Sequence, residues 1–205
     1  MSPRREEANR QIREGQRRNI AAAASRVFAR KGLAAARISD IAAEAGVSQG
    51  LVSHYFESKA ALFSELALEL MEAAVAAPAM AAKQPGTPLQ RLRWYLETTL
   101  AGMSSNPDSV MLLWQAQWSG GEGDELRKVI ARRGKAAISK LAELVSEAQK
   151  SGEVAPGDPA LVARHLVALL QGLAIQAAGG PVPEGYPSLE LVMRVVAPAG
   201  QGGRR

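Results

Sequence analysis

The sixteen residues from Ile41 to Phe56 read IAAEAGVSQGLVSHYF, and they indicate the fold more strongly than any other part of this 205-residue chain. The pattern predicts two short helices joined by a tight turn. Gly46 stands where the first helix must end, a position that favours a left-handed residue without a side chain. Ser48 follows, and we expect it to cap the second helix by accepting a hydrogen bond from a backbone N–H of the first turn. This is the arrangement of a helix-turn-helix.

The second of these helices has an apolar face and a polar face. Val52 and Phe56 are one turn apart and are expected to point into the core. The opposite face carries amide, hydroxyl and imidazole groups on a short helix, which suits a segment that contacts base edges in the major groove of DNA. We call this face and its flanks the recognition surface; it consists of Gln49, Gly50, Leu51, Ser53, His54 and Tyr55.

Three members of the recognition surface have alternative interpretations. Gln49 suits a contact with adenine or with a phosphate, but it is also an ordinary exposed residue at a helix start. Leu51 suits contact with a thymine methyl group, and simple packing explains it equally well. A metal-binding or catalytic role for His54 would need a partner, and the only other histidine, His165, lies far along the chain in an apolar helix.

Around this motif the chain resembles the TetR family of bacterial transcriptional regulators. The resemblance covers residues 18–66. It consists of a first helix that ends in Phe-Ala-Arg-Lys-Gly at residues 28–32, the motif itself, and Phe-Glu-Ser-Lys at residues 56–59. Ser53 departs from the pattern, because the family commonly has tyrosine at that position.

The resemblance also implies roles for individual residues. Ser48 and the recognition surface would contact DNA, and Lys59 would contact a phosphate, as would Arg37 by its position and charge. Parts of the chain are closer to one subgroup, the choline-responsive BetI-like repressors, although its ligand does not follow from these residues alone. The segments that carry this second resemblance are Gly50, residues 53–56, Lys59, residues 113–118 and residues 171–173.

The composition favours a helical protein with an anionic partner. Apolar residues make up 47% of the chain but aromatic residues only 4%, so the core consists mainly of Ala, Leu and Val, which favours helices. The formal net charge is +5, and residues 1–66 carry eleven Lys or Arg against seven Asp or Glu. Most of the attraction for phosphates is therefore expected at the end of the chain that carries the motif.

The chain contains no cysteine and begins with charged residues rather than an apolar signal segment. We therefore expect a cytoplasmic protein without disulfides. Residues 166–183 carry no formal charge, but Gln171, Gln176 and Gly179–Gly180 favour a buried helix over a membrane span.

Glycine, proline and capping residues divide the chain into about nine helices. Thr87 and Gln90 are spaced as a capping box with proline at the first helical position, Asp158 is expected to cap a helix that continues to about Ala178, and the last helix is expected over 188–196. No segment shows the alternation of apolar and polar residues that a half-buried strand has, so the predicted fold class is all-α. We expect a basic N-terminal arm over 1–16, a helix-turn-helix DNA-binding domain over 17–66 with the motif at about 38–57, a ligand-binding and dimerisation domain over 67–198, and a loose tail over 199–205. Residues 1–12 suit a solvated, disordered tail as well as a segment that attracts phosphates, and a folded helix that ends against DNA is expected from Arg17 onward. A long helix that begins near Lys59 is expected to fade by Pro78.

Two C-terminal helices carry more apolar residues than one packing face requires. One side of each is expected to face the chain's own core and the other a second subunit, so that a four-helix interface forms, as the family resemblance also implies. The alternative is a pair of helices packed entirely inside one chain. The residues assigned to the dimer interface are Val162, Leu166, Leu169, Leu173, Val192, Val195 and Val196.

The family resemblance further implies that a small molecule enters the core of the larger domain. Trp114 and Trp118 are one turn apart, and two indole rings with a carboxylate would hold a quaternary ammonium group by cation–π attraction. An elongated apolar ligand is at least as plausible, and core aromatics at helical spacing explain the same pattern. The candidate ligand-binding residues are Trp94, Glu97, Met103, Met111, Trp114, Gln115, Trp118 and Gln171, with Gln176 as a further polar group.

These features predict a ligand-responsive transcriptional regulator, in the family's usual form a homodimeric repressor that binds a palindromic DNA operator and is released by a small molecule. No cofactor or metal site is expected. An enzyme is unsupported, because the chain has no phosphate-binding glycine loop and no Ser/His/acid set that the helices would assemble. The alternative is a helical scaffold in which the motif is only a structural hairpin.

Overall fold

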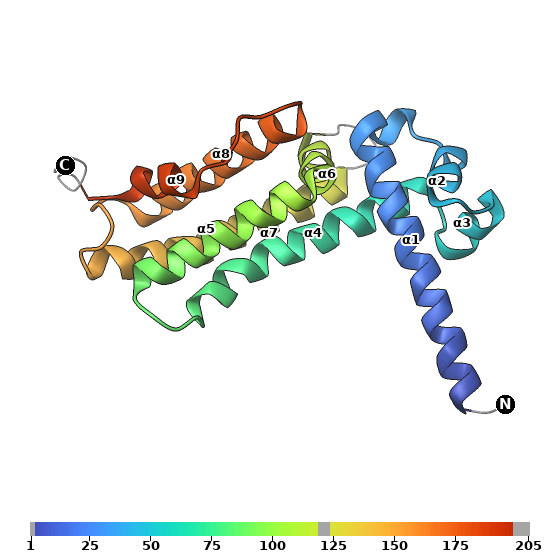
Figure 1. The fold of residues 1–205 in the computed structure, drawn as a ribbon, viewed down its shortest axis with the longest axis horizontal. Coiled ribbons are helices and arrows are strands. Elements are labelled where there is room, and N and C mark those ends of the chain that lie inside the picture. Colours follow the sequence, from blue (N-terminus) through green and yellow to red (C-terminus); the bar gives the residue numbers. More distant parts are fainter. Residues whose placement is uncertain (1–2, 119–123, 199–205) are drawn as a thin grey trace.

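The computed structural model describes residues 3–118 and 124–198, and within these ranges every regular element is an α-helix (Figure 1). The prediction of an all-α protein with about nine helices is confirmed. The helices are α1 (Pro3–Ala35), α2 (Ile38–Ala45), α3 (Gln49–Tyr55), α4 (Lys59–Ala82), α5 (Pro88–Ser105), α6 (Pro107–Trp118), α7 (Asp124–Lys150), α8 (Pro159–Ala178) and α9 (Leu189–Val196). The tail predicted over 199–205 lies outside the described residues.

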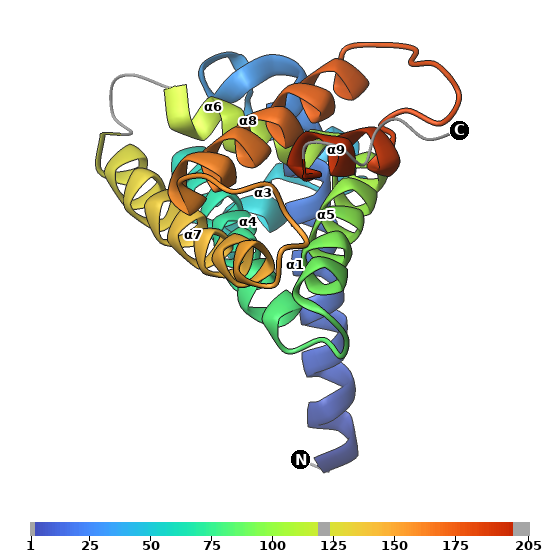
Figure 2. The same ribbon diagram turned by 90° about the vertical axis from the view of Figure 1, so that its left-hand side faces the viewer.

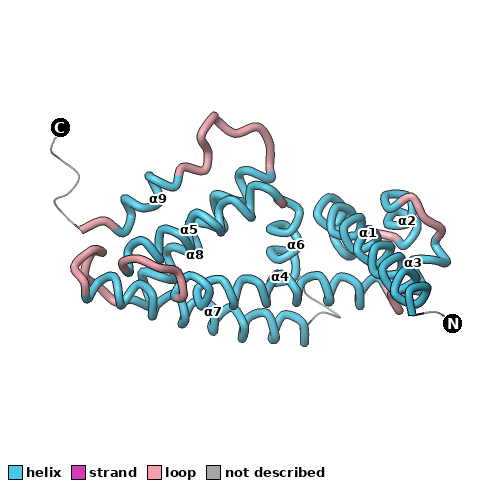
Figure 3. Tube along the Cα trace, turned by 60° about the horizontal axis from the view of Figure 1, so that its bottom comes forward, coloured by secondary structure: helices cyan, strands magenta, loops and turns pink. Residues whose placement is uncertain are grey.

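The helices form two parts of unequal size. In Figure 1, α1, α2 and α3 gather at one end, and α4 leads from them into an elongated body that contains α5 to α9. Along this body α4 packs against α7, and α7 packs in turn against α8 (Figures 2 and 3). The first half of α1 leaves the molecule as a projecting rod (Figure 1).

The small end has a core that continues into the body. Phe28 of α1 and Phe63 of α4 meet edge to face with ring centroids 5.2 Å apart, an arrangement that aromatic pairs favour. Fully buried side chains of α2 and α3, Ile41 and Val52, complete this core. The same cluster includes Leu112 of α6, so the small end, α4 and α6 share one continuous core. A second cluster joins α5, α7, α8 and α9.

Two helix ends differ from the expectation. Gly32 has a φ of 75°, which confirms a break in the first helix, yet the chain continues in helical form to Ala35 beyond the kink. The helix that begins at Lys59 continues through Pro78 to Ala82 instead of fading. Pro78 and Ala81 are buried, so packing in this alanine-rich segment outweighs the one backbone hydrogen bond that proline removes.

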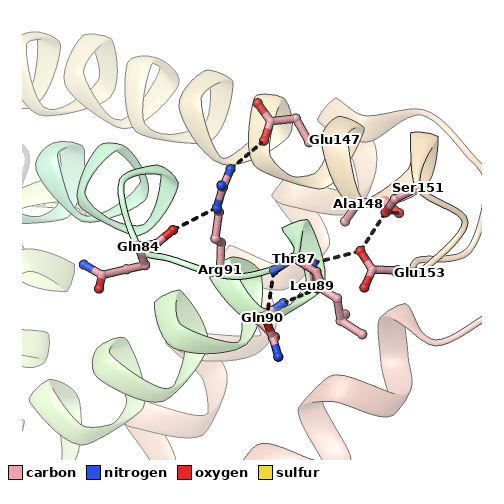
Figure 4. A network of polar contacts seen from close by, with 9 residues as sticks. All are labelled: Gln84, Thr87, Leu89, Gln90, Arg91, Glu147, Ala148, Ser151 and Glu153. Atoms are coloured by element: carbon pink, nitrogen blue, oxygen red, sulfur yellow. Dashed lines mark hydrogen bonds and ion pairs between the residues drawn. The ribbon is translucent and has the colours of Figure 1, made fainter.

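A polar network closes the end of the body that lies away from α2 and α3 (Figure 4). Thr87 and Gln90 form the predicted capping box: the Thr87 N–H donates to Gln90 Oε1 at 2.9 Å, and the Gln90 N–H donates to Thr87 Oγ1 at 3.3 Å. Glu153 accepts from the Ser151 hydroxyl at 2.7 Å and from the Leu89 N–H at 3.4 Å. These donors, the Ser151 hydroxyl most of all, hold the pKa of Glu153 below its ordinary value. The network ties the start of α5 to the turn after α7.

By length and composition, α8 is apolar enough to cross a membrane. Its inner face, with Ala163, Leu166 and Leu170, is buried in packing against α5, α6 and α7. Its outer face exposes Arg164 and His165, two polar side chains that a lipid-facing surface disfavours. The helix therefore packs on the body by one face, and His165 lies at its surface rather than among apolar neighbours.

Candidate nucleic-acid interface

The turn between α2 and α3 has the geometry that the sequence predicts. Gly46 adopts a φ of 67° and ψ of 33°, and the Val47 N–H donates to the Ala42 carbonyl at 3.0 Å, which closes the end of α2. Ser48 Oγ accepts from the Leu51 N–H at 3.2 Å and so caps α3. The two helices are thereby held in a fixed relation by local bonds.

The recognition surface lies outward while the other face of α3 is anchored. Val52 and Phe56 are almost completely buried, with 0% and 5% exposed. The remaining helix surface carries two classes of residue: Leu51 and Tyr55 are half-buried and pack on the core, whereas the other members are exposed. These exposed members are Gln49, Gly50, Ser53 and His54, beside Ser48.

Tyr55 has a structural contact that the sequence did not reveal. Its hydroxyl donates to Gln16 Oε1 of α1 at 2.9 Å, and its ring lies edge to face against His54 with centroids 5.2 Å apart. Arg17, next to Gln16, pairs with Glu65 of α4 and lies over the Phe56 ring, 4.9 Å from its centroid. The middle of α1 therefore holds the C-terminal end of α3.

Ion pairs fix α2 against α1. Glu44 accepts from Arg26 Nε at 2.7 Å and from Arg30 Nη2 at 2.5 Å, and Asp40 pairs with Lys31 Nζ at 2.9 Å. These bonds hold the pKa of Glu44 below its ordinary value, Arg26 contributing most, and Lys31 does the same for the pKa of Asp40. Part of the positive charge that the sequence assigned to phosphate attraction is thus paired with carboxylates of the protein itself.

Several arginines near the motif have exposed side chains. Arg13 and Arg18 of α1 and Arg37 are exposed, and none of them forms an ion pair within the described ranges 3–118 and 124–198. Arg37 directly precedes α2, where its backbone N–H donates to Asp40 Oδ2 at 3.0 Å. A guanidinium beside a helix N-terminus combines two features that favour an anion.

Lys59 is placed differently from the expectation. Its Nζ donates to the carbonyl oxygens of Leu33, Ala34 and Ala36, at 2.8, 3.0 and 2.8 Å. An ammonium has three donors, so all of them are used at the end of α1. The geometry does not support the phosphate contact that the resemblance implied, and it gives Lys59 a structural role instead.

Comparison with known proteins agrees with this geometry. Residues 20–66 match the family described as bacterial regulatory proteins, tetR family, and residues 88–197, more than half of the chain, match the family described as the C-terminal domain of BetI-type transcriptional repressors. The chain belongs to the TetR family. It is therefore a transcriptional regulator with a helix-turn-helix DNA-binding domain, and its larger domain is of the BetI type.

Individual TetR-family proteins show the extent of the similarity. The transcriptional regulator BetI of Vibrio vulnificus (strain YJ016) is 28% identical over 167 residues, which cover 80% of this chain and 82% of that protein. The MbdR regulator from Azoarcus sp. CIB has the same fold, with a TM-score of 0.74 at 22% identity over 88% of this chain and 96% of that one. AibR, solved in complex with isovaleryl coenzyme A and operator DNA, has a TM-score of 0.67 at 20% identity and covers 88% and 95%.

The tryptophan cage predicted for this TetR-family protein is not assembled in the core. Trp114 and Trp118 of α6 are 44% and 72% exposed, and Glu97 of α5 is exposed as well. A cation–π site needs aromatic faces that enclose the cation, which outward-facing rings do not supply. These two indoles therefore do not enclose a buried site in this structure.

The other candidate ligand residues are dispersed. Trp94 and Met103 pack on the second core cluster, while Met111 and Gln171 are half-buried. Gln115 of α6 donates from Nε2 to the Ala29 carbonyl of α1 at 3.3 Å, and Gln176 accepts from the Tyr186 hydroxyl at 2.9 Å. Gln115 thus contacts the DNA-binding end.

The predicted dimer residues divide into two groups. Leu166, Val192 and Val196 are 3% exposed or less and belong to the chain's own core, so they offer almost no surface to a second subunit. Val195 is exposed, and Val162, Leu169 and Leu173 are half-buried. The most exposed apolar side chains of α8 and α9 include Leu161 and Leu191, each one position before a predicted residue, Val162 or Val192.

An apolar groove runs between α8, α9 and the loop that joins them. Sequence patterns missed the loop residues that line it, because they lie outside any helix and have no periodicity. Exposed Leu191 is likewise a helix position that the prediction omitted. The lining residues are Leu169, Leu173, Pro183, Glu184, Gly185, Tyr186, Ser188, Leu191, Val192 and Val195.

Proposed function

We propose that this regulator is a homodimeric repressor that acts in the cytoplasm, where two recognition surfaces bind a palindromic operator and a small molecule releases them. The observation that carries this proposal is the way in which α3 is anchored and exposed. Its inner face is anchored by Val52 and Phe56 and its outer face is exposed and polar, so one rigid helix is ready for the major groove.

Each exposed group has a role that its chemistry suits. Gln49 and His54 are assigned to base edges, because a side-chain amide pairs with adenine and an imidazole with a base-edge acceptor or donor. Ser48 and Ser53 suit either a base edge or a phosphate. Arg37 suits a phosphate, and Gly50 leaves room for close approach of the backbone to the duplex. Leu51 and Tyr55 flank this surface and support it by packing.

Support for a dimer comes from the apolar surface of α8 and α9. Leu191 and Val195 are each 60% exposed, and Leu161 is 50% exposed. Exposed apolar side chains that line a groove mark an interaction surface. A twofold axis through this surface would give the two recognition helices the symmetry of a palindrome, about 34 Å apart on the duplex.

Support for ligand control comes from α6. Leu112 and Ala116 lie in the core that includes the small end, and Gln115 donates to α1, while α6 also packs against α8 of the larger domain. A ligand that displaces α6 would therefore move α1 and the recognition surface. The outward tryptophans favour an apolar small molecule over a quaternary ammonium compound, although the BetI-type domain makes choline the first compound to test.

The test is DNA binding by the purified protein to a duplex enriched from a randomised library by that same protein. We expect specific binding that weakens steeply with salt. The Gln49→Ala/His54→Ala variant should lose roughly 1–3 kcal/mol for each base contact removed, whereas Thr98→Ala, an exposed residue of α5, should bind like the parent. Failure to enrich any sequence would overturn the proposal in favour of a helical scaffold, and equal binding by both variants would overturn the assignment of Gln49 and His54 to base edges.

A further inference from the structure

The outer face of α7 runs along the surface of the body and carries a regular arrangement of charges. The inner face of this helix packs against α4 and α8. Ser139 is exposed and lies two and a half turns from each of the buried residues Ile130 and Ala148, so it marks the centre of the opposite side. Figure 2 shows α7 along one side of the body and α9 toward the other. The outer face consists of Lys128, Arg132, Lys135, Ser139, Glu143, Ser146 and Lys150.

The charges of this outer face change sign at Ser139. Arg132 and Lys135 precede it, and Glu143 follows it. Lys135 and Glu143 are both exposed, and they lie about 12 Å apart along the helix, which is too far for them to pair with each other. Neither forms an ion pair with any other residue in the described ranges 3–118 and 124–198. The outer face therefore offers a cation and an anion to a partner outside the chain.

These two charges are placed for pairing across a twofold axis through Ser139. Lys135 lies four residues before Ser139 and about 40° to one side of it, and Glu143 lies four residues after it and about 40° to the other side. A twofold rotation about Ser139 exchanges the two positions. In two antiparallel α7 helices, Lys135 of each copy therefore meets Glu143 of the other. Ala136 and Ala142 exchange in the same way, and side chains of this size allow the helices to approach closely.

The surface beside the acidic half of this face has room for the incoming lysine. A shallow depression of about 520 Å³ has Ser139, Ala142, Glu143 and Ser146 in its lining, so the side chain of Lys135 from a second copy would enter it next to a carboxylate. The ends of the face carry like charges, Lys128 and Lys150, about 16 Å from Ser139. Packed helices cross at an angle, so the ends diverge and the contact is confined to the central turns.

We propose that two copies of the chain from separate dimers associate through the outer faces of α7, in an antiparallel twofold contact centred on Ser139. This contact is distinct from the subunit contact proposed at α8 and α9, and it requires neither that contact nor DNA. An interface of a few helical turns is small, so the association is weak and transient. Two dimers held on neighbouring operators have a high effective concentration, and there the contact would favour joint binding.

The test measures self-association of the full chain by sedimentation equilibrium at about 0.1 M salt, where the net charge of +5 is screened beyond about 10 Å. Lys135→Glu and Glu143→Lys each place like charges opposite one another, and each should weaken association at least about tenfold. The double variant Lys135→Glu/Glu143→Lys restores opposite charges and should associate like the parent. Lys140→Glu makes the same change of charge beside the outer face and should also behave like the parent.

A second measurement locates the axis. The chain contains no cysteine, so Ser139→Cys places one thiol of each copy at the axis, where a short bifunctional thiol reagent should link two copies. Lys150→Cys, at the diverging end, should be linked much less. The link should persist when Leu191→Asp/Val195→Asp removes the groove contact. Association that is absent or insensitive to the charge variants, or a Ser139→Cys protein that is not linked, would overturn the α7 contact. Operator binding by a single dimer does not use α7, so the proposed function would still stand.

Discussion

Lys59 shows how one side chain can hold two helices of the DNA-binding end together. Its ammonium donates to three carbonyls at the end of α1, where the helix dipole is negative. We expect Lys59→Met to lose about 2 kcal/mol of unfolding free energy, because hydrogen bonds to a charged group contribute more than neutral ones. Chemical denaturation measures this loss, and Lys140→Met, an exposed lysine of α7, is the matched control.

The same variant separates the structural role of Lys59 from a phosphate contact. If the ammonium stays on the α1 carbonyls, Lys59→Met should leave the salt slope of DNA binding within error of the parent. A slope reduced by about 1 with unchanged stability would restore the phosphate contact and contradict the assignment.

Single residues were predictable where their partners are close in sequence. Gly46, Ser48 and the Thr87–Gln90 capping box act on bonds three to five residues away, and each lies as expected. Lys59 and Tyr55 find partners more than twenty residues upstream, at Leu33 and Gln16. No local pattern encodes such a contact. Lys59 and Tyr55 were therefore assigned to DNA from their chemistry alone, although both side chains also stabilise the fold.

At the scale of elements, acidic groups make the placement of α2 sensitive to pH. The pKa values of Asp40 and Glu44 are lowered by their partners on α1. A lowered folded-state pKa stabilises the protein above the unfolded-state pKa and loses that stabilisation as pH falls through the folded value. We expect the contribution of these two carboxylates to the unfolding free energy to be constant above about pH 5.5 and to fall below about pH 4.5.

The double variant Asp40→Asn/Glu44→Gln checks this assignment by denaturant titration across the same pH range. It should be less stable than the parent at neutral pH and should show a shallower decline on acidification. Glu69→Gln, an exposed residue of α4 outside these pairs, should retain the parental pH profile. An equally steep decline in the double variant would show that other carboxyl groups govern acid stability.

Helix positions were easier to predict than helix faces. Capping residues located α5, α8 and α9 closely, because a cap acts within one turn. In α8, apolar residues surround most of the helix, so the sequence did not distinguish Leu166, which is buried, from Leu161, which is exposed. The same ambiguity placed Trp114 and Trp118 in a pocket. Burial there depends on neighbouring helices that no local periodicity specifies.

At the scale of the whole molecule, the position of the apolar groove determines how two chains can meet. Leu191 and Val195 lie on α9, in the body and away from α2 and α3 (Figure 1). A subunit contact there leaves both recognition surfaces free. One continuous core extends from α3 through α4 and α6. A movement of helices in the body would therefore change the spacing of the two recognition helices, and a palindromic operator requires one fixed spacing.

This arrangement predicts that operator binding depends on residues far from DNA. Leu191→Asp/Val195→Asp puts two carboxylates into the apolar contact, and desolvation of unpaired charges costs several kcal/mol. The dimer dissociation constant should rise at least about a hundredfold, and operator affinity should fall with it although α3 is intact. Sedimentation equilibrium and DNA binding measure the two effects. Met80→Asp, an exposed apolar residue of α4, should remain a dimer; if the groove variant does too, the subunits meet through another surface.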